Sequence, residues 1–269
     1  MVDNSTSSVI ISGGTQGLGM AIAETLIAQG CKRLTITGRD AGKGKATAEQ
    51  LGKDGVDCLF VTCDVASIED CEAVVAKALA HHGFVNGLVN CAADTSRGSL
   101  VDTTPELWAR HMDINLRGPF LLMQGVVRHL LETGKPGSIV NILSTSAHVG
   151  QSFLTAYATS KGGLQTLTLN AANAYRSNLI RCNAVAPGWM DTPGEDVVQK
   201  KFHDAPDDWL AKAEAGLPMG QLVKPDQIAP LHAGQWCRDH GIRVHAIALG
   251  RGQQLAGGAF RALDTTAIQ

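Results

Sequence analysis

The chain has 269 residues, 44% of them hydrophobic, which suits one α/β domain with its own core. Its formal net charge of -2, without a basic stripe, argues against a nucleic-acid partner. The seven cysteines form no Cys-x-x-Cys pair, the N-terminus lacks signal-peptide character, and no apolar run nears the roughly 18 residues of a membrane span, so we expect a reduced, cytoplasmic protein without a membrane partner.

The first predicted strand, 8–11, runs into a glycine-rich turn and then a helix over 20–29. This order places the free N–H groups of a helix N-terminus before a phosphate. The turn spaces its glycines as Gly13-x-x-x-Gly17-x-Gly19, which differs from the commoner Gly-x-Gly-x-x-Gly fingerprint. A glycine turn alone is about as often a mere tight connection.

The second predicted strand, 33–37, ends at Gly38, Arg39 and Asp40. In a nucleotide-binding sheet an acidic residue here reads the adenosine ribose 2′-hydroxyl, whereas an arginine accepts a 2′-phosphate. Because glycine stands where the acid is expected and Arg39 follows, the sequence favours NADP(H). Asp40, together with the uncharged Gln16 in the glycine turn, keeps NAD(H) possible, and Arg39 as an ordinary turn residue remains an alternative.

The third and fourth strands are predicted over 58–63 and 87–90, with a helix over 67–80 between them that Ser67 caps. The third strand ends at Asp64 and Val65. Small residues at 91–93 follow the fourth strand and would let a flat ring lie close. A loop over 94–104 then crosses the crevice, and Pro105 opens a helix that includes 113–118.

The chemistry is expected between Ser144 and Lys161. A buried strand over 138–142 delivers the Ser144 hydroxyl to the crevice, and the next helix, which runs to Tyr175, carries Tyr157 and Lys161 four residues apart on one face. An ammonium beside a phenol lowers the phenol pKa, which makes Tyr157 a general acid/base. Alone, a Tyr-x-x-x-Lys pair is weak evidence.

The sixth predicted strand, 180–186, is broken by Pro187 and Gly188, and residues 189–217 have the composition of a mobile substrate lid. Repeated strand-helix units predict a doubly wound parallel sheet in three layers, a Rossmann-like α/β fold of one domain over 1–269.

Together these motifs resemble the short-chain dehydrogenase/reductase family over roughly 8–228. The resemblance implies a catalytic set of Asn115, Ser144, Tyr157 and Lys161. It implies cofactor contacts from Gly13, Thr15, Gln16, Gly17, Leu18, Gly19, Arg39, Asp64, Val65, Asn90, Ala92, Tyr157, Lys161, Pro187, Gly188 and Thr192. Tyr157 would exchange the proton, Lys161 would also bind the nicotinamide ribose, Ser144 would hold the substrate oxygen, and Asn115 would support a water chain to Lys161.

Two stretches depart from the family pattern. Ala93 replaces a usual glycine, and 230–269 forms a divergent C-terminal segment in which 243–249 is still expected to form a seventh strand. Pro230 falls inside a helix pattern, where a proline past the first turn costs about 3 kcal/mol. The substrate pocket and the subunit contacts are the features that this change affects most.

His148, Gln151 and Trp189, with Ser144, are expected to contact the substrate. Asp94, Arg97, Asp191 and Glu195 fit either a polar pocket or a solvated surface. His81 and His82 are assigned to an exposed helix end, and the histidine spacing predicts no metal site.

The sequence therefore predicts an NAD(P)(H)-dependent oxidoreductase (EC 1.1.1.-) that interconverts a secondary alcohol and a ketone. Its small-molecule substrate is expected to be a sugar, a polyol or another small polar carbonyl compound. The alternative is a non-catalytic dinucleotide-binding sensor or scaffold on the same fold. The apolar helix over 120–131 and the outer face of the Tyr157 helix predict a homodimer or homotetramer.

Overall fold

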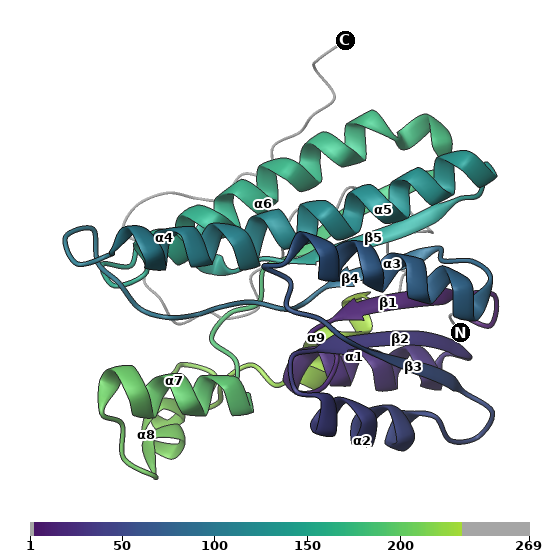
Figure 1. The fold of residues 1–269 in the computed structure, drawn as a ribbon. Helices are drawn as coiled ribbons and strands as arrows, with labels where there is room; N and C mark the ends of the chain where they lie inside the picture. The colour runs from purple at the N-terminus through teal and green to yellow at the C-terminus, as the bar shows by residue number, and fades with distance from the viewer. Residues whose placement is uncertain (1–2, 233–269) are drawn as a thin grey trace.

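The computed structural model describes residues 3–232, and its centre is a parallel sheet of six strands in the order β3-β2-β1-β4-β5-β6. Figure 1 shows the sheet between two layers of helices. The strands are β1 (Ser8–Ser12), β2 (Arg33–Gly38), β3 (Asp57–Thr62), β4 (Gly87–Asn90), β5 (Gly137–Ile142) and β6 (Ile180–Val185). The strand order reverses between β1 and β4, which confirms the predicted doubly wound, Rossmann-like fold.

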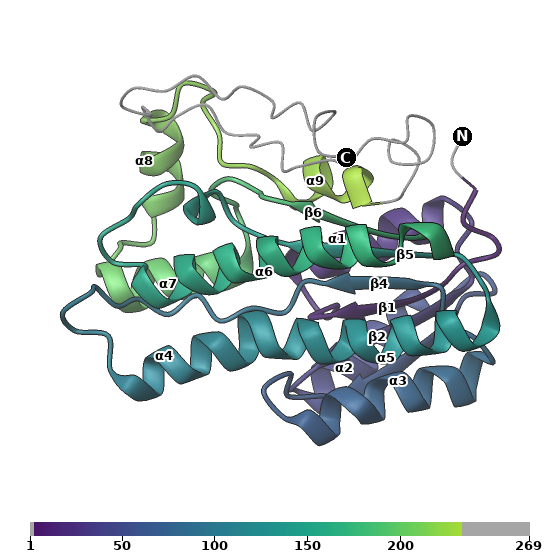
Figure 2. The ribbon, with the colours of Figure 1, turned by 90° about the horizontal axis from the view of Figure 1, so that it is seen from above.

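The helices divide between the two faces of the sheet (Figures 1 and 2). One face is covered by α1 (Gly17–Ala28), α2 (Ala41–Leu51) and α9 (Pro225–His232). The other carries α3 (Ile68–His82), α5 (Gly118–Thr133) and α6 (Thr155–Ala174). Short elements complete the set: α4 (Pro105–Met112), η1 (Asp113–Arg117), η2 (Thr145–Ala147), η3 (Arg176–Asn178), α7 (Pro193–His203) and α8 (Trp209–Ala215).

The strands are buried because both of their faces are covered. All five residues of β1 are buried, and its side chains alternate between the two layers. Ile10 packs with α3, α5 and α6, whereas Val9 and Ile11 pack with α1 and α2. This continuous apolar pattern is typical of a parallel strand at the centre of a three-layer fold.

Most predicted bounds lie within two residues of the observed ones, but α1 begins at Gly17 rather than at the predicted Met20. The Ser67 hydroxyl accepts the Asp70 N–H, so α3 begins where its cap was predicted. The segment 113–117, predicted as ordinary helix, instead forms a π-helical turn between α4 and α5. Such a turn inserts one residue into the helical ladder, and it redirects the side chains that follow.

The C-terminal helix α9 packs on α1 through buried Ile228 and Ala229. It continues through Pro230, which stands beyond the first turn. The predicted strand over 243–249 and the remainder of the divergent segment lie outside the described residues. Within 3–232, every helix is too short or too polar to cross a bilayer.

Candidate active site

A cavity of about 1030 Å³ opens along the carboxyl ends of the strands, where the strand order reverses. This is the edge at which open α/β sheets bind their ligands, and the volume exceeds that of a typical single small-molecule pocket. The glycine turn lines one end of the cavity, and residues from α6 and α7 line the other. The cavity can therefore hold a dinucleotide together with a small substrate.

At the nucleotide end, the glycine turn brings the N-terminus of α1 into the cavity. The first turn of α1 holds no acidic residue, and Gln16 at the N-cap makes no side-chain capping bond. A Cβ at Gly19 would lie 2.2 Å from the Gly13 carbonyl oxygen, so the turn closes only with glycine there. This tight turn leaves backbone N–H groups exposed to an anion, the arrangement that holds a pyrophosphate. Thr15, Gly17 and Leu18 line the same end.

Beyond β2, two cations line the cavity and the nearby carboxylate is occupied. Arg39 is exposed at the cavity rim, and Lys43 lies beside it with its ammonium bonded to Gln16. Asp40 caps α2, because its carboxylate accepts the Lys43 N–H at 2.9 Å. The acid that kept NAD(H) possible thus has a structural partner, while the cations face the cavity rim.

The other predicted cofactor contacts line the cavity, with one exception. Asp64, Val65, Ala92, Pro187, Gly188 and Thr192 are all among the lining residues. A Cβ at Gly17 would lie 3.6 Å from Thr192, so the start of α7 lies over the phosphate turn. Asn90 is buried instead, and its amide donates to Asn141 Oδ1 at 2.8 Å, which joins β4 to β5 below the cavity floor.

Ser144, Tyr157 and Lys161 come together at the middle of the cavity. Ser144 lowers the pKa of the Tyr157 phenol, which places its hydroxyl near that ring. Ser144 Oγ accepts from the Ser146 hydroxyl at 2.8 Å, so the serine is held in place. Lys161 is buried, with its Nζ 5.8 Å from the centre of the Tyr157 ring and 2.7 Å from the Ile142 carbonyl oxygen.

The prediction that Lys161 lowers the pKa of Tyr157 is wrong. Burial raises the pKa of Tyr157, and this effect is larger than the lowering effects of Ser144 and of the Arg97 cation. Burial likewise lowers the pKa of Lys161 to about 8. Desolvation disfavours both charged forms, so the protonated phenol is the favoured species at neutral pH.

Asn115 is placed by the π-helical turn and is fully buried. Its Nδ2 donates to the Asp94 carbonyl oxygen at 2.9 Å and to Ser160 Oγ at 3.1 Å, while its Oδ1 accepts the Asp94 N–H. Asn115 therefore ties the loop after β4 to the helix that carries Tyr157 and Lys161. In the described structure its partners are these groups, and it does not line the cavity.

At the substrate end, a polar network connects the loop after β4 with α7. The Arg97 guanidinium lies 3.6 Å from Glu195, 3.3 Å from His203 Nε2 and 5.5 Å from the centre of the Phe153 ring. Trp189 Nε1 donates to the same Glu195 carboxylate at 2.7 Å. Arg97 and Glu195, which the sequence left open, thus belong to the cavity wall with His148, Gln151 and Trp189.

Two further outcomes concern residues near this network. The carboxylate of Asp94, also left open, binds Arg110 and the Ser96 N–H. Asp191 points elsewhere, since it pairs with Lys224 at 2.9 Å.

Sequence reasoning missed His111 altogether. This residue is buried on α4, and its ring centre lies 6.3 Å from that of Tyr157. Its position four residues before Asn115 was the available signal, because these residues share a helix face.

A family model described as short chain dehydrogenase matches residues 7–202, which carry the glycine turn, Ser144, Tyr157 and Lys161. The chain belongs to the short-chain dehydrogenase family. It is therefore an NAD(P)-dependent oxidoreductase, as the names of its relatives also indicate.

Relatives and solved structures support the same assignment. The chain is 34% identical to an L-rhamnose 1-dehydrogenase (NAD(P)(+)) of Azotobacter vinelandii, over 82% of this chain and 86% of the relative. It is 30% identical to a provisionally named ketoacyl reductase of Streptomyces coelicolor, over 87% of this chain and 91% of the relative. A crystal structure of a variant actinorhodin polyketide ketoreductase with NADPH matches with a TM-score of 0.83 at 29% identity, covering 93% of this chain and 98% of that one.

Proposed function

We propose that the enzyme interconverts a secondary alcohol and a ketone, preferentially with NADP(H), and that Tyr157 is its general acid/base. The observation that carries this proposal is that Ser144, Tyr157 and the buried Lys161 line one cavity together, with the Lys161 Nζ 5.8 Å from the centre of the Tyr157 ring. The rest of the cavity, lined by the glycine turn, Arg39 and Asp64, gives a dinucleotide room to bind.

Each residue has a distinct part in this reaction. When bound, the dinucleotide accepts or supplies the hydride. Ser144 donates a hydrogen bond to the substrate oxygen and orients it, and Tyr157 passes a proton to that oxygen or takes it back. The phenol is protonated at neutral pH, so it can donate a proton to a ketone oxygen, and because burial raises its pKa the bound substrate and cofactor must lower that pKa for efficient transfer. Lys161 binds the ribose hydroxyls, and Asn115 holds the helix and the loop in register.

The preference for NADP(H) follows from the residues beyond β2. Gly38 has no acid to bind a ribose hydroxyl, and the Asp40 carboxylate is engaged at the N-terminus of α2. Arg39 and Lys43 supply two positive charges at the rim where a 2′-phosphate would lie. An arginine can form a bidentate hydrogen bond with a phosphate, so we assign the 2′-phosphate to Arg39.

The substrate end favours a polar carbonyl compound of the sugar or polyol type. Arg97, Glu195, Gln151 and His148 line it together, so hydroxyl groups can find both donors and acceptors. We propose that residues 189–217, which include α7 and α8, act as the substrate lid. The L-rhamnose dehydrogenase among the relatives fits a sugar-like substrate without defining it.

A coupled assay tests the proposal directly. The purified protein is mixed with NADPH or NADH and a panel of ketoses, aldonolactones and small ketones, and the loss of nicotinamide absorbance is followed. We expect turnover with at least one carbonyl compound, faster with NADPH. In Tyr157→Phe we expect at least a roughly thousand-fold lower kcat, since the proton donor is gone.

The alternative, a non-catalytic sensor on the same fold, predicts a different result. It would bind the dinucleotide and turn over no panel member, and the wild-type protein and Tyr157→Phe would give the same absorbance trace. Ser152→Ala serves as a control, because it removes a hydroxyl from an exposed position five residues before the tyrosine. A control variant that lost as much activity as Tyr157→Phe would contradict the assigned role.

We also propose that the enzyme forms a homodimer or homotetramer through α5 and α6. Phe120 and Leu131 on α5 and Leu169 on α6 are 41%, 41% and 39% exposed, a high value for large apolar side chains on helices that otherwise face the core. Light scattering of the full chain measures the assembly, and a purely monomeric mass would contradict this expectation.

A further inference from the structure

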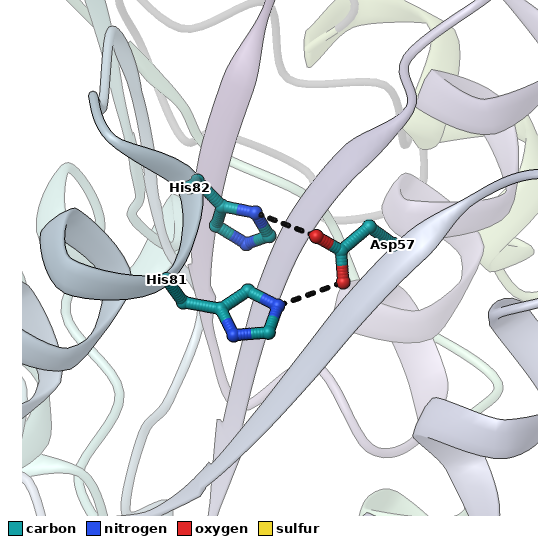
Figure 3. A group of neighbouring side chains, drawn as sticks. All are labelled: Asp57, His81 and His82. Carbon is teal, nitrogen blue, oxygen red and sulfur yellow. Dashed lines mark hydrogen bonds and ion pairs between the residues drawn. The ribbon is translucent and has the colours of Figure 1, made fainter.

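A second cluster of ligand-bearing side chains lies at the opposite end of the sheet from the catalytic cavity. Asp57 is the first residue of β3, and His81 and His82 are the last two residues of α3. Figure 3 shows both imidazoles turned toward the single carboxylate. One ligand atom from each residue lies within 4.8 Å of the others, and residues 3–232 hold no other such group of three.

The two histidines approach different oxygens of Asp57. His81 Nε2 lies 2.8 Å from Oδ1, and His82 Nδ1 lies 3.3 Å from Oδ2. The side chains of His81 and Asp57 are 43% and 54% exposed, whereas that of His82 is 1% exposed. The cluster therefore has one buried, fixed member and two members that solvent can reach.

The buried His82 has a ring nitrogen without a hydrogen-bond partner. Its Nε2 lies 3.1 Å from the Leu34 carbonyl oxygen, which can only accept, so Nε2 carries the proton. In the neutral ring Nδ1 then presents a lone pair, and this buried atom makes no hydrogen bond. It faces a carboxylate oxygen, which also presents lone pairs. A cation between the two atoms would satisfy both.

We propose that Asp57, His81 and His82 bind a divalent first-row transition metal ion of the Zn²⁺ type. Two imidazoles and a carboxylate are the ligands such an ion prefers, at about 2.0–2.2 Å, which sets them roughly 3.3 Å apart around a tetrahedral ion. The bond from His82 to the Leu34 carbonyl is the orienting contact that metal-binding histidines usually make through their second nitrogen. The exposed His81 and Asp57 can rotate to close the wider separations, and water completes the coordination.

This site would act on stability rather than on the reaction. It joins the end of α3 to the starts of β2 and β3, whereas the catalytic cavity lies at the other ends of the strands. Sequence reasoning assigned the two histidines to an exposed helix end because the third ligand comes from 24 residues earlier in the chain. Only the sheet brings it to them.

Titration of the metal-stripped full-length protein with ZnCl₂ tests the proposal. By calorimetry we expect Asp57→Asn and His81→Ala to reduce the affinity of one saturable site by at least about ten-fold. At a hundred-fold excess over the wild-type Kd, Zn²⁺ should raise the Tm of the wild-type protein by roughly 5 °C and that of these two variants by no more than about half as much. Both substitutions alter exposed side chains, so neither variant should lose its fold.

Two more variants complete the design. His82→Gln retains a donor for the Leu34 carbonyl but removes the ring nitrogen that faces Asp57, and it should also lose the site. His129→Gln removes a histidine on α5 outside the cluster, and its affinity should equal that of the wild-type protein. A wild-type protein that binds no Zn²⁺ at micromolar concentrations would overturn the proposal, because a simple ion pair then explains the cluster. Undiminished binding by Asp57→Asn and His81→Ala would overturn it as well.

Discussion

The two ends of the catalytic cavity are built in different ways. The nucleotide end is made of backbone: glycines that admit no Cβ, a helix N-terminus and strand ends fixed by the sheet. The substrate end is made of side chains that meet across the fold, such as Arg97, Glu195 and His203. A site made of backbone tolerates few substitutions and keeps binding one class of ligand. A site made of side chains can bind a different ligand after a single substitution. This contrast gives four predictions.

Gly19→Ala should have the largest effect, because it breaks the nucleotide end itself. The new Cβ would lie 2.2 Å from the Gly13 carbonyl oxygen, so the turn must open and its N–H groups must move. We expect NADPH affinity to fall by roughly 100-fold or more in a fluorescence titration. Gly162→Ala on α6, where a Cβ meets open space, is the matched control and should bind NADPH normally. Normal binding by Gly19→Ala would contradict the backbone account.

Lys161→Met tests the buried cation between the two ends. The folded-state pKa is lowered from 10.5 to about 8, so between these values the unfolded chain binds more protons and stability rises with pH. The free energy of unfolding of the wild-type protein minus that of Lys161→Met should therefore increase by roughly 2 kcal/mol from pH 8 to pH 10. Urea unfolding at these pH values measures it. The other cysteines with raised pKa values act equally in both proteins, whereas Cys91 loses the Lys161 charge that lowers its pKa, so Cys91→Ala is placed in both backgrounds. A constant difference would mean that Lys161 is hydrated.

Arg97→Met should affect substrate binding and leave the nucleotide end intact. Removing a charged donor from the cavity wall costs about 1.5–3 kcal/mol, so KM for the best polar substrate should rise by roughly 10- to 100-fold while the Kd for NADPH stays constant. Arg128→Met, on α5, provides a control for loss of charge. An unchanged KM would show that Arg97 only supports Glu195.

Arg39→Asp should have the smallest effect, because this side chain is exposed and water screens its charge. We expect the ratio of kcat/KM for NADPH to that for NADH to fall by about 5- to 10-fold. Arg176→Met on η3 serves as the control. If the ratio does not move, Lys43 rather than Arg39 meets the 2′ position, and Lys43→Met then becomes the sharper variant.

Local patterns in the sequence predicted which residues line the cavity at the glycine turn and around Tyr157. The glycine turn, Ser144, Tyr157 and Lys161 each lie within one strand-turn-helix unit, so their spacing together with the family resemblance placed them at the cavity. The Arg97–Glu195 contact and the cluster around Asp57 join segments that only the folded sheet brings together. No local pattern indicates them.

The structure differs from the prediction at two further points, because both depend on the folded surroundings of a residue rather than on its neighbours in the sequence. The π-helical turn that positions Asn115 has no signal in the hydrophobic pattern. The pKa of Tyr157 was assigned the wrong direction because sequence spacing reveals a nearby charge but not the loss of solvent around it.

Lys224 gives the segment 189–217 a property that a free loop lacks. Its ammonium binds Asp191 near one end of the segment and Glu214 near the other, and Asp191 and Trp189 exchange backbone hydrogen bonds with Val223. These contacts hold the segment near both of its ends. The conformational entropy of its residues is thus given up once, at folding, and each arriving substrate molecule meets a wall that is already ordered.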